Sequence, residues 1–269
     1  MSQKCLWTFL SVFFLNFNFA YSFETLPQRG ILAHRGASSS FPENTVSALS
    51  AAVRLGAQGV EFDVRVSKDN QLVLMHDSSV DRTTDGEGEV KNLTLKQLKH
   101  LDAGHWKNKS FKGERVPTFA EALAVLPRTI WLNIHVKDSR AVPEIAKAIS
   151  ASKRQHQTLI ACLEEDVEIV RQIDPTLKII NMSRKSSNLK YIEATIELGT
   201  YGIQFNSDLM AAKPNDILYA QQAGLVTFNA GTDNPKKIAQ LFQQGIRFVL
   251  ADNPTEALAV FNSTTNLNY

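Results

Sequence analysis

Two histidines and a pair of carboxylates in the first third of the chain could together perform acid–base and metal chemistry. Glu61 and Asp63 stand two residues apart. His34 precedes them with Arg35 beside it, and His76 follows them. Histidines exchange protons near neutral pH, carboxylates bind hard cations, and a guanidinium binds phosphate. Together these side chains supply the groups for metal-assisted cleavage of a phosphodiester.

Strand geometry predicts that these residues meet. Glu61 and Asp63 lie in an apolar, β-branched run, where alternate side chains project from one face of a strand. The residues that follow predict a hairpin with its turn at Asp69 and Asn70. Because the two arms of a hairpin run antiparallel, His76 should lie roughly opposite Asp63. A cation held by the carboxylates would then be within reach of His76.

Eight short apolar runs, which alternate with segments of helical periodicity, indicate the elements that position this group. The runs lie near residues 31, 60, 130, 159, 178, 203, 226 and 249. The segments between them carry apolar residues at three- and four-residue spacing and often end in glycine. This alternation over roughly 240 residues predicts a (β/α)8 TIM barrel of the α/β class, with a doubly wound open sheet as the alternative.

A barrel also specifies where the chemistry should lie. The catalytic side chains of such barrels project from the C-terminal ends of the strands. The predicted strands of this chain end at His34 with Arg35, at Glu61 with Asp63, and at Lys137. The candidate residues therefore fall at one end of the expected barrel.

A long interruption, from about Val80 to Pro117, separates the hairpin from the next predicted strand. It holds a glycine-containing acidic stretch, a short helical segment and the aromatic residues Trp106 and Phe111. An insertion on the catalytic side could form a lid or a wall of the substrate site. An excursion into solvent without substrate contact is the other interpretation.

The first residues differ from the rest of the chain. Lys4 precedes a short apolar run, and the small residues Ala20 and Ser22 follow it. This pattern predicts a cleavable signal peptide, residues 1–22, because the run is too short for a comfortable membrane span. A retained anchor helix is the alternative. We therefore expect export to the periplasm or the exterior, with residues 23–269 as a single domain.

Charge and cysteine content narrow the possible partners. The formal net charge of +2 falls to +1 when the signal peptide and its lysine are removed. Such a nearly neutral protein gives no electrostatic reason to expect nucleic acid or an anionic membrane as a partner, and no membrane span should remain after cleavage. Cys162 then remains as a single cysteine in an apolar run, which predicts a buried strand residue rather than a nucleophile.

From about Ile31 to Leu258 the chain resembles the glycerophosphodiester phosphodiesterase family, whose fold is a PI-PLC-like (β/α)8 barrel. The resemblance depends on an ordered set of motifs, because a single His-Arg-Gly arises readily by chance. These motifs are AHRGASSSFPENT, EFDVRVSKDNQLVLMHD, DRTTDGEGEV, LTLKQLKHLDAG, ERVPTFAEAL, LNIHVK and LADNP. The resemblance implies a metal-dependent hydrolase that converts glycerophosphodiesters to glycerol 3-phosphate and an alcohol.

The resemblance also implies roles for individual residues. His34 and His76 match the paired acid–base histidines of the family. Arg35 matches its phosphate ligand, and Glu61 and Asp63 match two of its metal ligands.

Three further polar residues match positions of the family's site. Glu43 matches an acid that is expected to orient Arg35 or a substrate hydroxyl, and Lys137 matches a lysine that would offset phosphate charge. Asn229 is a candidate polar contact of the substrate. Val226 departs from the family, which often has tryptophan there, and Phe228 is the residue that could supply an aromatic wall instead.

The most consequential departure is His135, which stands where the family usually has a third metal-binding carboxylate. It shares strand parity with Lys137, so it should still face the site. Mg²⁺ or Ca²⁺ is the expected cofactor, but imidazole favours Mn²⁺ or Zn²⁺. Altered metal preference, a weakened two-carboxylate site and a decayed site are the three interpretations.

Three functions remain open at this stage. The first is an exported glycerophosphodiester hydrolase. A lysophospholipase D-like enzyme is the second, and would use apolar walls from Trp106, Phe111 and Phe228. The third is a binding or effector barrel that has lost turnover through His135. In the first two, the only partner expected is a small glycerophosphodiester or a lysophospholipid.

Overall fold

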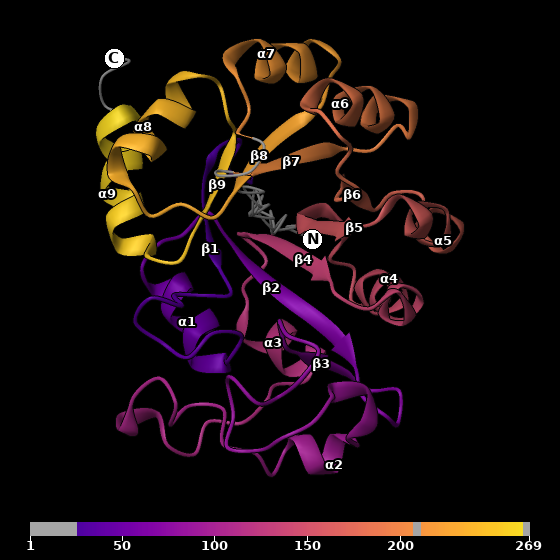
Figure 1. The fold of residues 1–269 in the computed structure, drawn as a ribbon, viewed down its shortest axis with the longest axis vertical. Helices are drawn as coiled ribbons and strands as arrows, with labels where there is room; N and C mark the ends of the chain where they lie inside the picture. Colours follow the sequence, from indigo (N-terminus) through magenta and orange to yellow (C-terminus); the bar gives the residue numbers. More distant parts are fainter. Residues whose placement is uncertain (1–25, 207–210, 266–269) are drawn as a thin grey trace, which may run out of the picture.

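The computed structural model describes residues 26–206 and 211–265. Within these residues, eight strands run parallel and close into a barrel, because β1 pairs with both β2 and β9 (Figure 1). The barrel strands are β1 (Gly30–His34), β2 (Gly59–Val66), β4 (Trp131–Val136), β5 (Thr158–Cys162), β6 (Lys178–Asn181), β7 (Gly202–Asn206), β8 (Val226–Ala230) and β9 (Phe248–Ala251). All eight predicted runs are strands, so the barrel is confirmed and the open sheet is wrong.

Helices surround the strands on the outside of the barrel (Figure 1). Local sequence sets where several of them begin: Thr45 caps the helix that follows it, Thr118 and Glu121 form a capping box, and three helices begin at proline. The helices are α1 (Val46–Arg54), α3 (Phe119–Val125), α4 (Val142–Ala151), α5 (Val167–Ile173), α6 (Asn188–Glu197), α7 (Pro214–Gln222), α8 (Pro235–Gln243) and α9 (Pro254–Thr265). None of the described helices is long and apolar enough to span a bilayer.

The barrel interior is filled by side chains rather than open. Phe228 is fully buried there and stacks on Phe248, with the ring centroids 5.2 Å apart. The prediction that Phe228 walls the substrate site is therefore wrong, because its strand register sets it at the level of the start of β9. Cys162 is buried as predicted, and burial raises the pKa of its thiol to about 12.

The predicted hairpin is confirmed. β3 (Leu72–Leu74) runs antiparallel to β2, and Asn70 occupies the left-handed region at the turn, with φ of 58°. The amide of Met75 donates to the carbonyl of Asp63 over 3.1 Å. Met75 thus lies opposite Asp63, and His76 follows one residue beyond the predicted register.

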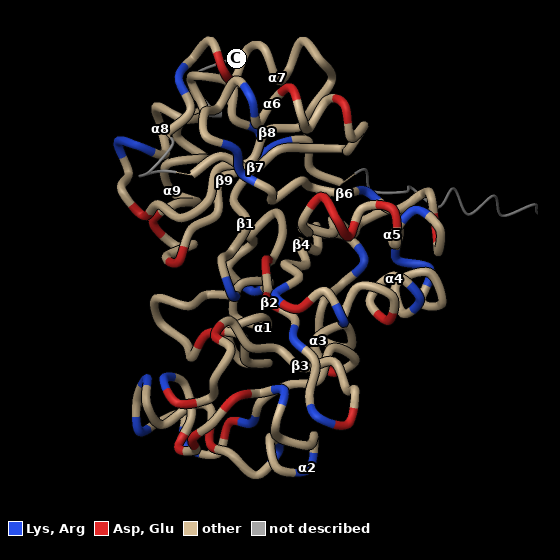
Figure 2. Tube along the Cα trace, turned by 45° about the vertical axis from the view of Figure 1, so that its right-hand side comes forward, with Lys and Arg blue, Asp and Glu red and all other residues tan. Residues whose placement is uncertain are grey.

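The insertion after the hairpin forms the lower part of the view in Figure 1. It contains the short helices η1 (Val90–Asn92), α2 (Leu95–Leu98) and η2 (Lys109–Phe111). Its small core, which includes Val80, is separate from the core of the barrel. Charged residues of both signs alternate along its Cα trace (Figure 2). The predicted signal peptide, residues 1–22, lies outside the described residues, so the domain limits remain a prediction.

Candidate active site

Glu61 and Asp63 are the buried acids of the site. They lie on β2 with side chains 1% and 0% exposed. The parallel pairing of β2 with β4 sets His135 beside Asp63. Nδ1 of His135 lies 3.6 Å from Oε1 of Glu61 and 3.5 Å from Oδ1 of Asp63. The expectation that His135 faces the carboxylates is thereby confirmed.

These three side chains fit a metal ion. One ligand atom from each lies within 4.8 Å of the others. Oε1 of Glu61 and Oδ1 of Asp63 are buried and accept no hydrogen bond from the described residues. Buried carboxylate oxygens are costly unless a cation or a donor satisfies them. The donor set is two oxygens and one imidazole nitrogen, which transition metals accept more readily than Ca²⁺ does.

The other oxygens of the two carboxylates are held by the β1–α1 loop. The side-chain amide of Asn44 donates to Oδ2 of Asp63 over 2.8 Å, and the backbone amide of Arg35 donates to Oε2 of Glu61 over 2.9 Å. Asn44 and Arg35 both have left-handed backbone, with φ of 57° and 58°. This strained loop therefore aims the remaining oxygens of Glu61 and Asp63 at His135.

Two cationic side chains lie beside Asp63. Nζ of Lys137 lies 3.3 Å from Oδ1 of Asp63, and Nε of Arg35 lies 3.5 Å from its Oδ2. Burial alone would raise the pKa of Asp63, but Lys137, His135 and other nearby cationic groups lower it well below its usual range. Asp63 is therefore ionised throughout the neutral pH range.

His34 ends β1 and is paired with an aspartate that follows β9. Nδ1 of His34 lies 2.7 Å from Oδ1 of Asp252, which also accepts a hydrogen bond from the hydroxyl of Ser38. Nε2 of His34 lies 3.9 Å from Oε2 of Glu61. Burial lowers the pKa of His34, but Glu61 and Asp252 outweigh it, and the net pKa is raised.

His76 follows β3 and has a similar partner. Its Nδ1 lies 2.7 Å from Oδ1 of Asp77, and its carbonyl accepts two hydrogen bonds from the guanidinium of Arg65. Burial lowers the pKa of His76, and Lys137 and Arg35 lower it further, which together outweighs the raising effect of Asp63 and Asp77. The two histidines therefore have the same partner chemistry and opposite pKa directions.

A cavity of about 370 Å³ opens beside His34. Its lining residues are His34, Arg35, Ser38, Ser39, Glu43, Trp106, Lys107, Asp233 and Asp252. Trp106 and Lys107 belong to the insertion, and Nζ of Lys107 donates to the carbonyl of Ser38 over 2.7 Å. The insertion is thus a wall of the site and not a free excursion into solvent.

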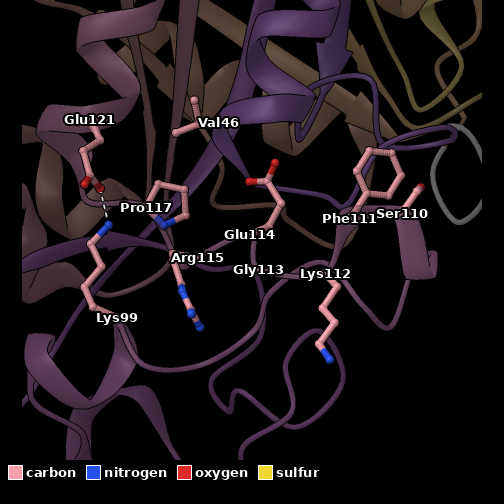
Figure 3. A pocket seen from close by; sticks show the side chains of 10 residues that line it. All are labelled: Val46, Lys99, Ser110, Phe111, Lys112, Gly113, Glu114, Arg115, Pro117 and Glu121. Atoms are coloured by element: carbon pink, nitrogen blue, oxygen red, sulfur yellow. Dashed lines mark hydrogen bonds and ion pairs between the residues drawn. The ribbon is translucent and has the colours of Figure 1, made fainter.

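The other aromatic residue of the insertion lies elsewhere. Phe111 packs against Phe41, with ring centroids 5.3 Å apart, and lines a separate open groove of about 480 Å³. Figure 3 shows Phe111 at one end of this groove and the ion pair of Lys99 with Glu121 at the other. Of the three aromatic residues predicted to wall the substrate site, only Trp106 lines the cavity beside His34.

Comparison with known proteins identifies the family. The model of the glycerophosphoryl diester phosphodiesterase family matches residues 34–256. The chain belongs to this family. A glycerophosphodiester phosphodiesterase of Caldanaerobacter subterraneus is 30% identical over 232 residues, which cover 83% of this chain and 94% of that protein. Glycerophosphodiester phosphodiesterase 1 of Bos taurus is 35% identical over 173 residues, covering 57% and 52% of the two chains.

Solved structures of the family have the same fold. A phosphodiesterase of Oleispira antarctica in complex with the product sn-glycerol-3-phosphate superimposes with a TM-score of 0.79 at 27% identity, covering 88% of this chain and 97% of that one. A glycerophosphodiester phosphodiesterase of Agrobacterium tumefaciens gives 0.76 at 26% identity, covering 86% and 99%. The predicted family and enzyme class, a phosphoric diester hydrolase, are confirmed.

Most candidate residues of this family member lie together, with one exception. Glu43 accepts a hydrogen bond from Nη1 of Arg35 over 2.9 Å, which is the first of the two contacts predicted for it. Asn229 follows Phe228 on β8 and pairs with Val249 of β9. Val249 lies three positions before Asp252, which follows β9. The structure does not place it among the groups above, and its role toward substrate stays a prediction.

Sequence reasoning missed four residues of this site. Each stands in a motif that carried the family resemblance: Asn44 beside Glu43, Asp77 beside His76, Arg82 at the start of the insertion, and Asp252 directly after the last predicted strand. Arg82 belongs to the site because its guanidinium donates to both Asp77 and Glu43. Position at the C-terminal end of a barrel strand could have singled out Asp252.

Proposed function

We propose that this chain is a metal-dependent glycerophosphodiester phosphodiesterase that releases glycerol 3-phosphate and an alcohol. One observation carries the proposal: two histidine–aspartate pairs stand beside a set of two carboxylates and an imidazole suited to a cation. Family membership supports the same reaction. The roles assigned by resemblance to His34, His76, Glu61 and Asp63 are part of this proposal.

The side chains of the site would divide the work as follows. Arg35 and Lys137 bind the phosphate and offset the negative charge that grows in the transition state. One histidine takes the proton of the attacking oxygen, and the other gives a proton to the leaving alcohol. Asp252 and Asp77 each hold Nδ1 of one histidine, which leaves Nε2 for the exchange. The attacking oxygen belongs to water or to the glycerol 2-hydroxyl.

Glu61, Asp63 and His135 would hold the divalent cation, Mg²⁺ or Ca²⁺ as in the initial expectation, or Mn²⁺ or Zn²⁺ as His135 favours. The bound cation supplies Lewis acidity toward the phosphate oxygens. Nζ of Lys137 lies 3.3 Å from Oδ1 of Asp63, so its positive charge would act beside this metal site.

The lining of the cavity favours a water-soluble substrate. Apart from Trp106, its described walls are hydroxyl, carboxylate, imidazole and cationic groups. Phe228 is in the barrel core, and Phe111 lines the other groove, so two of the three apolar walls that would suggest a lysophospholipase D-like activity are absent from this cavity. We therefore place the glycerophosphodiester first.

We also propose that the protein is exported after removal of residues 1–22, on the sequence pattern alone. N-terminal sequencing of the native product tests this. We expect the mature chain to begin near Tyr21 or Phe23, whereas an intact Met1 in a membrane fraction would support the anchor helix.

Hydrolysis of glycerophosphocholine by the purified protein tests the activity. Parallel reactions would contain EDTA, Mg²⁺, Ca²⁺, Mn²⁺ or Zn²⁺, and ³¹P NMR would identify the products. We expect glycerol 3-phosphate in at least one metal and none in EDTA, with slower turnover of lysophosphatidylcholine. Absence of turnover with every metal would favour the decayed binding barrel, and faster lysophospholipid turnover would favour the phospholipase D-like enzyme.

A further inference from the structure

Arg82, at the start of the insertion, joins two carboxylates from different segments of the chain. Its Nε and Nη2 donate to Oδ2 and Oδ1 of Asp77 over 2.6 and 3.1 Å. Its Nη1 and Nη2 donate to Oε2 and Oε1 of Glu43, each over 2.8 Å. Four of the five donors of the guanidinium are therefore used, two on each carboxylate.

Each of these carboxylates holds a residue of the proposed mechanism on its other side. Asp77 binds Nδ1 of His76 over 2.7 Å, and Glu43 accepts from Nη1 of Arg35 over 2.9 Å. Arg82 is consequently the middle of a continuous series of polar contacts that joins the proton-exchanging imidazole to the phosphate-binding guanidinium.

We infer that Arg82 is a positioning residue that sets His76 and Arg35 relative to each other. The inference rests on the proposed function, because that function gives His76 and Arg35 their roles. Arg82 is not among the residues that line the cavity beside His34, and its described contacts are to carboxylates. It acts through Asp77 and Glu43 and does not touch the reacting atoms.

Electrostatics explains why an arginine is required at this point. Glu43 and Asp77 are both anionic and are drawn to one guanidinium, so removal of that group would leave two like charges facing each other. The hydrogen bond from Arg82 is the largest cause that holds the pKa of Asp77 below its usual range. Burial raises the pKa of Glu43, but the effects of Arg82 and Arg35 are larger, so the net pKa is lowered. Lysine would keep the charge and lose the forked geometry.

The backbone under Arg82 is anchored well enough to transmit position. Val80 is fully buried. Its N–H donates to the carbonyl of Gly88, and its carbonyl accepts from the hydroxyl of Thr84. The hydroxyl of Thr83 donates to the sulfur of Met75, next to His76. The guanidinium therefore projects from a fixed turn rather than from a free loop.

The test compares Arg82→Gln, Arg82→Lys and Arg82→Ala with Arg115→Gln. Arg115 is a matched control in the same insertion, because its Nη1 donates to the carbonyls of His100 and Leu101 and to no group of the site. We expect Arg82→Gln to lower kcat/KM for glycerophosphocholine by about 10- to 100-fold, as misplaced positioning groups do, with most of the loss in kcat. Arg82→Lys should be intermediate, and Arg115→Gln should be within about twofold of wild type.

Two readouts separate positioning from a purely structural link between insertion and barrel. Added guanidinium should restore part of the activity of Arg82→Ala and leave Arg115→Gln unchanged. The imidazole resonances of His76, followed by NMR without substrate, should shift in Arg82→Gln and not in Arg115→Gln. Equal loss of kcat/KM and of Tm in the two Gln variants, with no rescue, would overturn the inference. Unshifted imidazole resonances of His76 in Arg82→Gln would also overturn it. This NMR readout does not depend on turnover. Absence of turnover in the wild type would therefore count against the proposed function and not against the positioning role of Arg82.

Discussion

His34 and His76 have the same kind of partner but are held by different parts of the molecule. Nδ1 of each lies 2.7 Å from an aspartate oxygen. His34 ends β1, and its partner Asp252 directly follows β9, the adjacent barrel strand. His76 follows β3, an arm outside the closed barrel, and its partner Asp77 is the next residue. Backbone pairing fixes the first pair, whereas side-chain ion pairs fix the second.

The surroundings then separate two similar pairs chemically. His34 faces the carboxylate of Glu61, which raises its pKa against the effect of burial. Burial is the largest cause that lowers the pKa of His76, and the cations Lys137 and Arg35 lower it further. An acid–base pair needs groups whose pKa values are pushed apart. The barrel and the hairpin provide this difference with one residue type.

The largest effect should come from removing either histidine. We expect His34→Ala and His76→Ala each to lower kcat by about 10²- to 10⁴-fold, because each removes one proton-transfer group. Steady-state kinetics on glycerophosphocholine, with circular dichroism to check folding, measures this. His100→Ala, in the insertion, is the control and should retain wild-type kcat. A folded variant of His34 or His76 with near wild-type kcat would show that the substituted histidine has no catalytic role.

Changing the metal set should alter preference more than rate. We expect His135→Glu to strengthen activation by Mg²⁺ or Ca²⁺ and to weaken that by Mn²⁺ or Zn²⁺, because a charged oxygen replaces a neutral nitrogen. His135→Gln controls for the loss of imidazole without added charge. Metal titrations of activity, with calorimetric binding in parallel, measure the change. Unchanged relative metal constants in His135→Glu would mean that His135 does not contact the cation.

The opposite pKa shifts of His34 and His76 predict that the two histidines contribute to stability in different pH ranges. In EDTA, NMR titration should place His34 above the ordinary histidine value of about 6.5 and His76 below it. Protonated His34 therefore stabilises the fold below about pH 6.5, and this contribution is lost as the pH rises through its folded pKa. Neutral His76 contributes stability above about pH 6.5, and this is lost as the pH falls through its folded pKa. The reverse order of the two titrations would contradict the comparison.

The smallest effect on activity should come from the barrel interior. Phe228→Ala removes a fully buried ring and should cost about 3–5 kcal/mol of unfolding free energy. Because Phe228 lies below the site, kcat/KM should remain within about twofold of wild type at a temperature where the variant is folded. Denaturant unfolding and kinetics on two glycerophosphodiesters measure both. A change in the ratio of the two kcat/KM values would indicate that Phe228 contacts the substrate after all.

The sequence was sufficient for those features that depend on periodicity. Each barrel strand was predicted from a short apolar run, and alternation placed Glu61, Asp63 and His135 on inward positions. Register was less accessible, because a shift by one residue at the hairpin leaves the apolar pattern of β3 almost unchanged, and this displaced His76 from its expected position. Phe228 was misplaced because parity gives the face of a strand but not the depth along it.

Partners from distant segments were the least predictable. Asp252 is 218 residues from His34, and Arg82 is 39 residues from Glu43. Each pair forms only when the closed barrel and the folded insertion bring the segments together. Charged residues of this kind look like ordinary surface positions in the sequence, so a motif or a structure is needed to connect them.

The most direct test of the centre is anomalous diffraction from crystals soaked with Mn²⁺ and glycerol 3-phosphate. We expect one strong manganese peak bonded by Oε1 of Glu61, Oδ1 of Asp63 and Nδ1 of His135, with the phosphate against Arg35 and between the two histidines. A peak at another position, with the phosphate away from Arg35, would contradict the proposed centre.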